Sequence, residues 1–139
     1  YYKLIERNVF FHDFVKYEDL TGFISTADVG IMLNYKPKWP SHWFSLPNRI
    51  FDYSNAGLAI LSTNQPEFSR FIKENKNGEF FNLDIKLDLS EKLKTIIHDR
   101  QEYKSNSLKN VSNNVWENEQ KILMGIYKKY LVCEKFITD

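Results

Sequence analysis

The sequence predicts an α/β fold in which helices flank a mainly parallel sheet. Short apolar runs of strand length alternate along the chain with amphipathic stretches of helical length, and this order is typical of parallel sheets with right-handed crossovers. The runs at 29–33 and 59–61 are continuously apolar, as are strands that are buried on both faces. We therefore expect 29–33 to be a central strand of a single domain that spans residues 1–139.

The elements before the first long loop follow from the same pattern. The helix in this part carries apolar residues at helical spacing on its inner side, namely Leu20, Phe23, Ile24 and Ala27. In chain order we predict the end of a helix at 1–6, a strand at 8–11, a loop at 12–15, a helix at 17–27 and a strand at 29–33.

The loop at 34–44 is rich in aromatic and cationic residues and contains Pro37 and Pro40. Two prolines so close together predict that it has no regular structure. Loops at the carboxyl ends of strands are where α/β sheets bind ligands. Two interpretations are open: the loop contacts a ligand, or its Trp39 and Trp43 pack against the domain.

The stretch at 45–64 predicts a loop, a helix, a tight turn and a buried strand. We expect Ser45 to cap the helix, Pro47 to lie in its first turn and Gly57 to end it with a positive φ. Arg49 and Asp52 are three residues apart and share one helix face. A helix N-terminus suits a phosphate, and a carboxylate one turn later can accept hydrogen bonds from sugar hydroxyls. A nucleotide sugar needs both; the alternative is an ordinary helix–strand pair with solvated polar residues.

The rest of the chain predicts one more strand and four further helices. Phe68, Phe71 and Ile72 should face inward from the first of these helices, as should Leu89, Leu93, Ile96 and Ile97 from the second. Trp116, Leu123, Tyr127 and Tyr130 fall near one stripe of the last. The expected elements are a helix from 65 to about 77, a strand at 79–82, a helix that Asp88 and Glu91 begin as a capping box, a short helix within 105–114 and a long helix at 115–132.

Composition limits the classes of function. Nineteen basic and 18 acidic residues give a net charge of +1, which argues against a broad nucleic-acid-binding surface because that would need a basic excess. The single Cys133 excludes an internal disulfide and favours a reducing compartment. No cluster has metal-ligand spacing, and the scattered His12, His42 and His98 identify no catalytic residue.

The sequence also bears on location. No apolar run approaches the roughly 20 residues of a membrane span, and there is no signal peptide. The chain begins with Tyr1 rather than Met, so we expect a fragment of a longer protein, located in the cytoplasm.

Several of these segments, in their order and spacing, resemble the C-terminal half of GT-B glycosyltransferases of the group 1 type, which binds the nucleotide sugar. The resemblance covers almost the whole chain and implies a Rossmann-like sheet in the order 3-2-1-4-5-6, of which the first strand, helix and strand are missing here. The matching segments are Asn8-Val9-Phe10-Phe11, residues 27–33, residues 45–53 with Ala56-Gly57, residues 75–78, Trp116 and residues 126–130.

The resemblance also implies a donor site. In such enzymes the second acidic residue of a Glu-x7-Glu pattern binds the ribose hydroxyls, and Asp52 holds that position here. The first acidic position is Phe44, so the sequence departs from the full pattern. Ser45, Pro47 and Arg49 instead match the Ser-x-Pro-x-Lys version of many relatives.

By the same resemblance, the loop at 12–15 should lie against the base, and Ser45 with the backbone of Leu46 should lie near the diphosphate. Arg49 either neutralises the diphosphate or forms a structural ion pair. The expected donor-binding residues are His12, Phe14, Val15, Ser45, Leu46, Pro47, Arg49 and Asp52.

The activity implied is transfer of a sugar from a UDP- or GDP-sugar to an acceptor hydroxyl with retention, as in polysaccharide biosynthesis, with no further cofactor. The acceptor, a carbohydrate or a lipid-linked one, would bind through an absent N-terminal domain, so we expect the fragment to be inactive alone. It could be peripheral at the inner membrane face. With no strand to fill the place beside 29–33, the fragment is expected to self-associate or to pack differently. A nucleotide-sugar 2-epimerase of GT-B type and a non-catalytic GT-B-like binding module stay open as alternatives.

Overall fold

Three parallel strands form the sheet at the centre of the molecule. The structure is a computed structural model that describes residues 8–34, 39–113 and 115–133. The strands are β1 (Val29–Met32), β2 (Ala59–Thr63) and β3 (Gly78–Phe81), and they lie in the order β1-β2-β3 with both pairs parallel. The predicted α/β class with a parallel sheet is confirmed. The helix end predicted at 1–6 lies outside the described residues.

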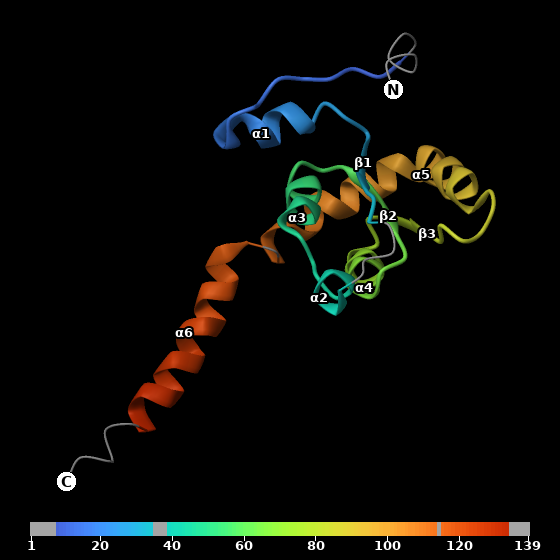
Figure 1. Cartoon of the computed structure of the whole chain (residues 1–139). Helices are drawn as coiled ribbons and strands as arrows, with labels where there is room; N and C mark the ends of the chain where they lie inside the picture. Colours follow the sequence, from blue (N-terminus) through green and yellow to red (C-terminus); the bar gives the residue numbers. More distant parts are fainter. Residues whose placement is uncertain (1–7, 35–38, 114, 134–139) are drawn as a thin grey trace.

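Helices cover both faces of this sheet (Figure 1). They are α1 (Tyr17–Ile24), α2 (Pro40–Trp43), α3 (Asn48–Asn55), α4 (Pro66–Asn75), α5 (Asp88–Asn110) and α6 (Trp116–Cys133), with a 3₁₀ turn η2 (Val111–Asn113) before α6. One apolar cluster joins Ile60 to Ile50 of α3 and Phe68 of α4. A second cluster joins Leu61 to Ile96 of α5. Because successive strand residues point to opposite faces, α3 and α4 cover one face and α5 covers the other.

The second strand behaves as the sequence predicts. All five residues of β2 are buried. This is the result expected for a continuous apolar run in a sheet that helices cover on both faces. Phe68, Phe71 and Ile72 of α4 are also buried, as expected. Gly57 has a φ of +72° where α3 turns into β2, so its predicted role at the helix end is confirmed.

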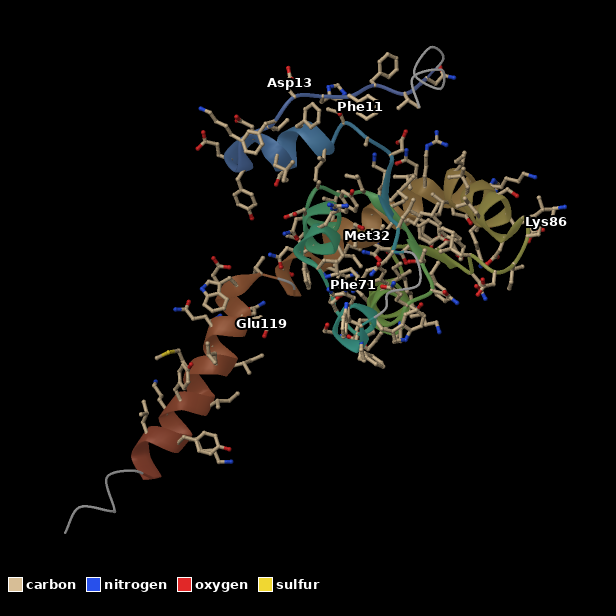
Figure 2. The ribbon with its side chains drawn as sticks, viewed as in Figure 1. Phe11, Asp13, Met32, Phe71, Lys86 and Glu119 are labelled. Atoms are coloured by element: carbon tan, nitrogen blue, oxygen red, sulfur yellow. The ribbon has the colours of Figure 1, made fainter. Side chains whose placement is uncertain are left out.

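The strand predicted at 8–11 is not formed, and β1 is an edge strand rather than a central one. Phe10 and Phe11 are 81% and 79% exposed. Figure 2 shows Phe11 on a segment that stands away from the layered body, whereas Met32 and Phe71 lie within it. An apolar run becomes a strand only where a neighbouring backbone accepts and donates its hydrogen bonds, and the described part of the chain supplies none beyond β1.

Helix α1 is shorter than the predicted 17–27 and buries none of its residues. Phe23, expected on its inner side, is 41% exposed, while Leu20 and Ile24 are half-buried. The apolar residues of α1 therefore have the predicted helical spacing, but few other residues pack against them.

Two predicted helix caps are wrong because the side chains have other partners. Pro47, not Ser45, is the N-cap of α3, and the Ser45 hydroxyl donates to the carbonyl oxygen of His42 at 3.1 Å. Asp88 is the first residue of α5 rather than its cap. Its carboxylate accepts a hydrogen bond from the backbone N–H of Asn82 at 2.6 Å.

The loop at 34–44 is not wholly irregular, because Pro40 begins the short helix α2. Proline is tolerated in the first turn of a helix, where its missing N–H would be unpaired. Residues 35–38 of this loop lie outside the described residues. Of the two tryptophans expected to pack against the domain if the loop binds no ligand, Trp39 is 66% exposed and does not, whereas Trp43 is 37% exposed and partly covered.

Helix α5 continues to Asn110 and absorbs most of the polar stretch at 105–114, where a separate short helix was predicted. Its polar residues bind the backbone of the sheet layer. The Ser107 hydroxyl donates to the carbonyl of Leu58 at 2.7 Å, and the Asn106 amide donates to the carbonyl of Lys76 at 2.8 Å.

Only part of the predicted inner face of α5 is correct. Ile96 is fully buried and Leu93 is half-buried. Leu89 and Ile97 are 45% and 51% exposed instead. The strand at 79–82 and the helix at 115–132 are confirmed to within one residue at each end, as β3 and α6.

A charged group on the third strand fastens α5 to the sheet. The carboxylate of Glu79 accepts a hydrogen bond from Lys92 Nζ at 2.8 Å and another from the Tyr103 hydroxyl at 2.8 Å. Burial and the bond to Glu79 raise the pKa of Tyr103 above its ordinary value. The hydrogen bond to Glu79 also raises the pKa of Lys92.

Replacing Gly57 should destabilise the domain. The substitution Gly57→Ala forces a Cβ into the left-handed region and within 2.9 Å of the Leu108 side chain, so we expect the free energy of unfolding to fall by about 1–2 kcal/mol. Gly22→Ala is the matched control, because a Cβ there meets nothing within 4 Å. Because Gly22 lies within α1, this control substitution should raise the free energy of unfolding by about 0.5–1 kcal/mol. Urea unfolding of both variants checks this, and an equal response would contradict it.

The Tyr103–Glu79 bond predicts a loss of stability at high pH. An unfolded tyrosine titrates near pH 10. Because the folded pKa is higher, the contribution of the neutral phenol is complete below about pH 10 and is lost as the pH rises from there toward the folded pKa. Tyr103→Phe should cost about 1 kcal/mol at neutral pH and should reduce the alkaline loss. Unfolding across this pH range measures both, with Tyr127→Phe on the exposed α6 as the control.

Candidate functional site

A cavity of about 350 Å³ opens at the carboxyl edge of the sheet. Its lining comes from the end of β1 and the residues after it, from the start of α3 and from α4: Met32, Leu33, Asn34, Pro47, Arg49 and Phe68. Because a helix that follows a parallel strand begins at that strand's carboxyl end, α3 presents its N-terminus to this edge. This is the position at which open α/β sheets bind ligands.

A polar network holds the chain in place beside the cavity. The backbone N–H of Asn34 donates to Thr63 Oγ1 at 3.3 Å. The Asn34 amide donates to Gln65 Oε1 at 3.1 Å, and the Gln65 amide donates back to the Asn34 carbonyl at 3.2 Å. Gln65 and Thr63 are buried, so the residues that follow β1 are fixed to the end of β2 by satisfied, water-excluded hydrogen bonds.

The leading end of α3 has no side-chain cap. Its N-cap is Pro47, which makes no side-chain hydrogen bond. The first backbone N–H bonded back to this residue is that of Ile50, at 3.1 Å from the Pro47 carbonyl. The N–H groups of the first turn have no partner within a helix. Since Pro47 and Arg49 line the cavity, this end of the helix and its positive dipole are open to a ligand.

The side chain of Arg49 is exposed at the cavity, and among the described residues it makes no ion pair or hydrogen bond. The structural ion pair left open by the sequence is therefore not found in the part of the chain that the structure covers. Asp52 lies three residues further along α3, on the side that faces away from the buried Ile50 and Ser54. It is half-buried, is likewise unpaired among the described residues, and does not line the cavity that contains Arg49.

The structure does not bring the residues at 12–15 to this cavity. His12 lines a different cavity, of about 320 Å³, which also contains Val29, Gly30 and Ile31 of the free edge of β1. Its ring packs edge-on against Phe23 at 5.0 Å between centroids. Phe14 is 92% exposed and Val15 is half-buried. Because the segment before α1 does not join the sheet, nothing carries it toward the carboxyl edge.

The predicted diphosphate residues lie closer to the cavity. Leu46 packs half-buried against the apolar cluster on the α3–α4 face. Ser45 is half-buried and bonded to the carbonyl of His42. Of the residues predicted from the sequence, Pro47 and Arg49 are the two that line the cavity itself.

Sequence reasoning missed Asn34, Thr63 and Gln65. A signal for them was present, because each follows or ends an apolar run that forms a parallel strand. Since neighbouring parallel strands end at the same edge, polar residues there are expected to meet.

Neither a metal centre nor a membrane span is visible in the residues that the structure describes. No group of three histidine, cysteine or acidic side chains is placed to hold a metal ion among them. No helix within 8–34, 39–113 or 115–133 combines the length and the apolar character needed to cross a bilayer.

Comparison with known protein families, with curated proteins and with solved structures found no match to this chain. A function for this chain must therefore be inferred from the geometry of the cavity and from the resemblance of the sequence motifs.

Proposed function

We propose that this chain binds a nucleoside diphosphate sugar, as the donor-binding half of a GT-B glycosyltransferase of the group 1 type. One observation carries the proposal: the N-terminus of α3, which has no side-chain cap, and the guanidinium of Arg49, which has no partner among the described residues, share a cavity at the carboxyl edge of a parallel sheet. This combination suits a compact dianion such as a diphosphate. The motif Ser45, Pro47, Arg49 and Asp52 gives the same helix its resemblance to the family.

The chemistry asks little of the side chains beyond charge stabilisation. When the bond between the sugar and the diphosphate breaks, negative charge grows on the leaving phosphate. Backbone N–H groups held by the helix and a cation close to that phosphate stabilise the transition state more than the bound donor. The first turn of α3 and Arg49 supply both, while the acceptor hydroxyl attacks from the face that the diphosphate leaves.

Asp52 is proposed to bind the ribose hydroxyls, because within 8–34, 39–113 and 115–133 its carboxylate has no partner and because it lies one turn from Arg49. The base contacts that the resemblance assigns to His12, Phe14 and Val15 are left out of the proposal. His12 lines the cavity at the edge of β1, and neither His12, Phe14 nor Val15 lines the cavity that contains Arg49.

Neutralising Arg49 tests the anion site. Arg49→Gln should weaken the binding of UDP and GDP by about 10- to 100-fold, since a hydrogen bond to a charged group contributes about 1.5–3 kcal/mol. The binding of uridine and guanosine, which carry no phosphate, should not change. Calorimetric titration measures all four dissociation constants.

The matched control is Arg100→Gln, which removes an equal charge from the exposed face of α5, where Arg100 donates to the carbonyl of Ile97. An unchanged UDP affinity in Arg49→Gln, or an equal loss in Arg100→Gln, would contradict the site. In the complete protein, sugar transfer supports a transferase and interconversion of the donor supports an epimerase. Binding alone supports a non-catalytic module.

Removing the Asp52 carboxylate tests the ribose contact. Asp52→Ala should weaken the binding of a nucleotide sugar by about 1–3 kcal/mol, the cost of leaving two hydroxyls without their acceptor. The same substitution should leave the affinity for a 2′,3′-dideoxynucleotide unchanged, because that ligand lacks both hydroxyls. Combining the change in the protein with the change in the ligand forms a cycle of the double-mutant type, which separates a direct contact from a general disturbance of α3. If both ligands lose the same affinity, Asp52 does not touch the ribose.

A further inference from the structure

Helix α6 stands apart from the layered body and exposes its apolar side. In Figure 1 it projects away from the sheet and its covering helices, and Figure 2 shows Glu119 near its start, beyond that body. The large apolar side chains from 122 to 131 are between 36% and 65% exposed: Ile122, Leu123, Met124, Ile126, Tyr127, Tyr130 and Leu131. A surface of this size on one helix marks a place where something else binds.

Between residues 121 and 131 the side chains of α6 separate into two sides, while the acidic Glu117 and Glu119 lie in its first turn. Successive residues of a helix turn by about 100°, which places all seven apolar residues within an arc of about 200°. The other side of the same stretch carries only Lys121, Gly125, Lys128 and Lys129. No acidic residue occurs between 121 and 133, so this part of the helix has a formal charge of +3 on its polar side.

We propose that α6 binds the surface of an anionic lipid bilayer, lying in the plane of the headgroups with its lysines toward the phosphates. A helix with lysines on one side and aliphatic and aromatic residues on the other is the type that binds there. This binding surface is separate from the cavity beside Arg49 and does not depend on the proposed function.

Charge and shape favour lipid over a second copy of this chain. The seam of a two-helix coiled coil is a narrow stripe, whereas the apolar side of α6 covers more than half of the circumference. In a parallel pair, a second α6 would also place lysines beside lysines, because its carboxylates, Glu117 and Glu119, lie in the first turn, away from Lys128 and Lys129. Anionic headgroups supply the missing negative charge, and the acyl boundary covers the wide apolar arc.

Vesicle co-sedimentation of the full chain tests this. The protein should bind vesicles of phosphatidylcholine mixed with phosphatidylglycerol and should bind phosphatidylcholine alone much more weakly. Added salt should weaken the binding, because it screens the lysines. The triple variant Lys121→Gln, Lys128→Gln, Lys129→Gln should bind the anionic vesicles about 100-fold more weakly, at about 1 kcal/mol for each lysine.

The matched control removes three exposed lysines outside α6, with Lys86→Gln, Lys94→Gln and Lys109→Gln. It has the same net charge as the triple variant of α6, and its binding should stay close to that of the unmodified chain. The double variant Leu123→Gln, Tyr127→Gln keeps the charge but interrupts the middle of the apolar arc, and it should also bind weakly.

Three results would overturn the proposal. One is the absence of binding to anionic vesicles by the unmodified chain. Another is an equal loss in both triple-lysine variants, which would show attraction by net charge alone. The third is a stable dimer that does not bind vesicles and that the double variant Leu123→Gln, Tyr127→Gln dissociates. In that case a second copy of the chain, and not lipid, would cover α6. Circular dichroism of each variant confirms that the domain is folded.

Discussion

Burial of β2 on both faces is the constraint on which the rest of the structure depends. Ile60 packs toward α3 and α4, and Leu61 packs toward α5. Full burial of such side chains stabilises a fold by about 1.5–3 kcal/mol each. Only in the centre of a covered sheet can consecutive residues be buried in this way, so β2 fixes where both helical layers must lie.

The position of the cavity follows from that arrangement. With β2 central and its neighbours parallel to it, each covering helix must begin at the carboxyl edge of the sheet and end at the opposite edge. The N-terminus of α3 therefore reaches the edge at which Thr63 and Gln65 bind Asn34. Because of the topology, Arg49 lies beside a helix N-terminus and beside a wall held by hydrogen bonds, and a ligand need not organise that N-terminus or that wall.

The sequence predicted the elements whose residues depend on local pattern and on burial. The strand β2, helix α4 and the turn at Gly57 are correct because apolar runs, helical spacing and a glycine determine them without reference to distant residues. The strand at 8–11 failed because an apolar run cannot supply its own neighbour. The caps at Ser45 and Asp88 failed because each side chain found a partner that propensity does not reveal.

At the candidate site, the sequence identified the helix but not the network beside it. Arg49 and Pro47 were found because they lie close together in a recognisable motif. The contact between Asn34 and Gln65 joins residues 31 positions apart, and only the register of β1 against β2 brings them together. The loop at 12–15 was misplaced because its predicted position required the segment at 8–11 to pair with the sheet. The described residues do not form that pairing.

The molecule is unevenly held together, and the cavity lies at the boundary. On one side, β2, β3, α4 and α5 share both apolar clusters and the Glu79 bonds. On the other, β1 is an open edge and α1 buries nothing, so this side is expected to open first. The Asn34–Gln65 bonds fasten the chain after β1 to the better-packed side. They keep the part of the cavity wall formed by Asn34 in place even when the edge beyond β1 fluctuates, and a fixed wall is part of what a preorganised anion site requires.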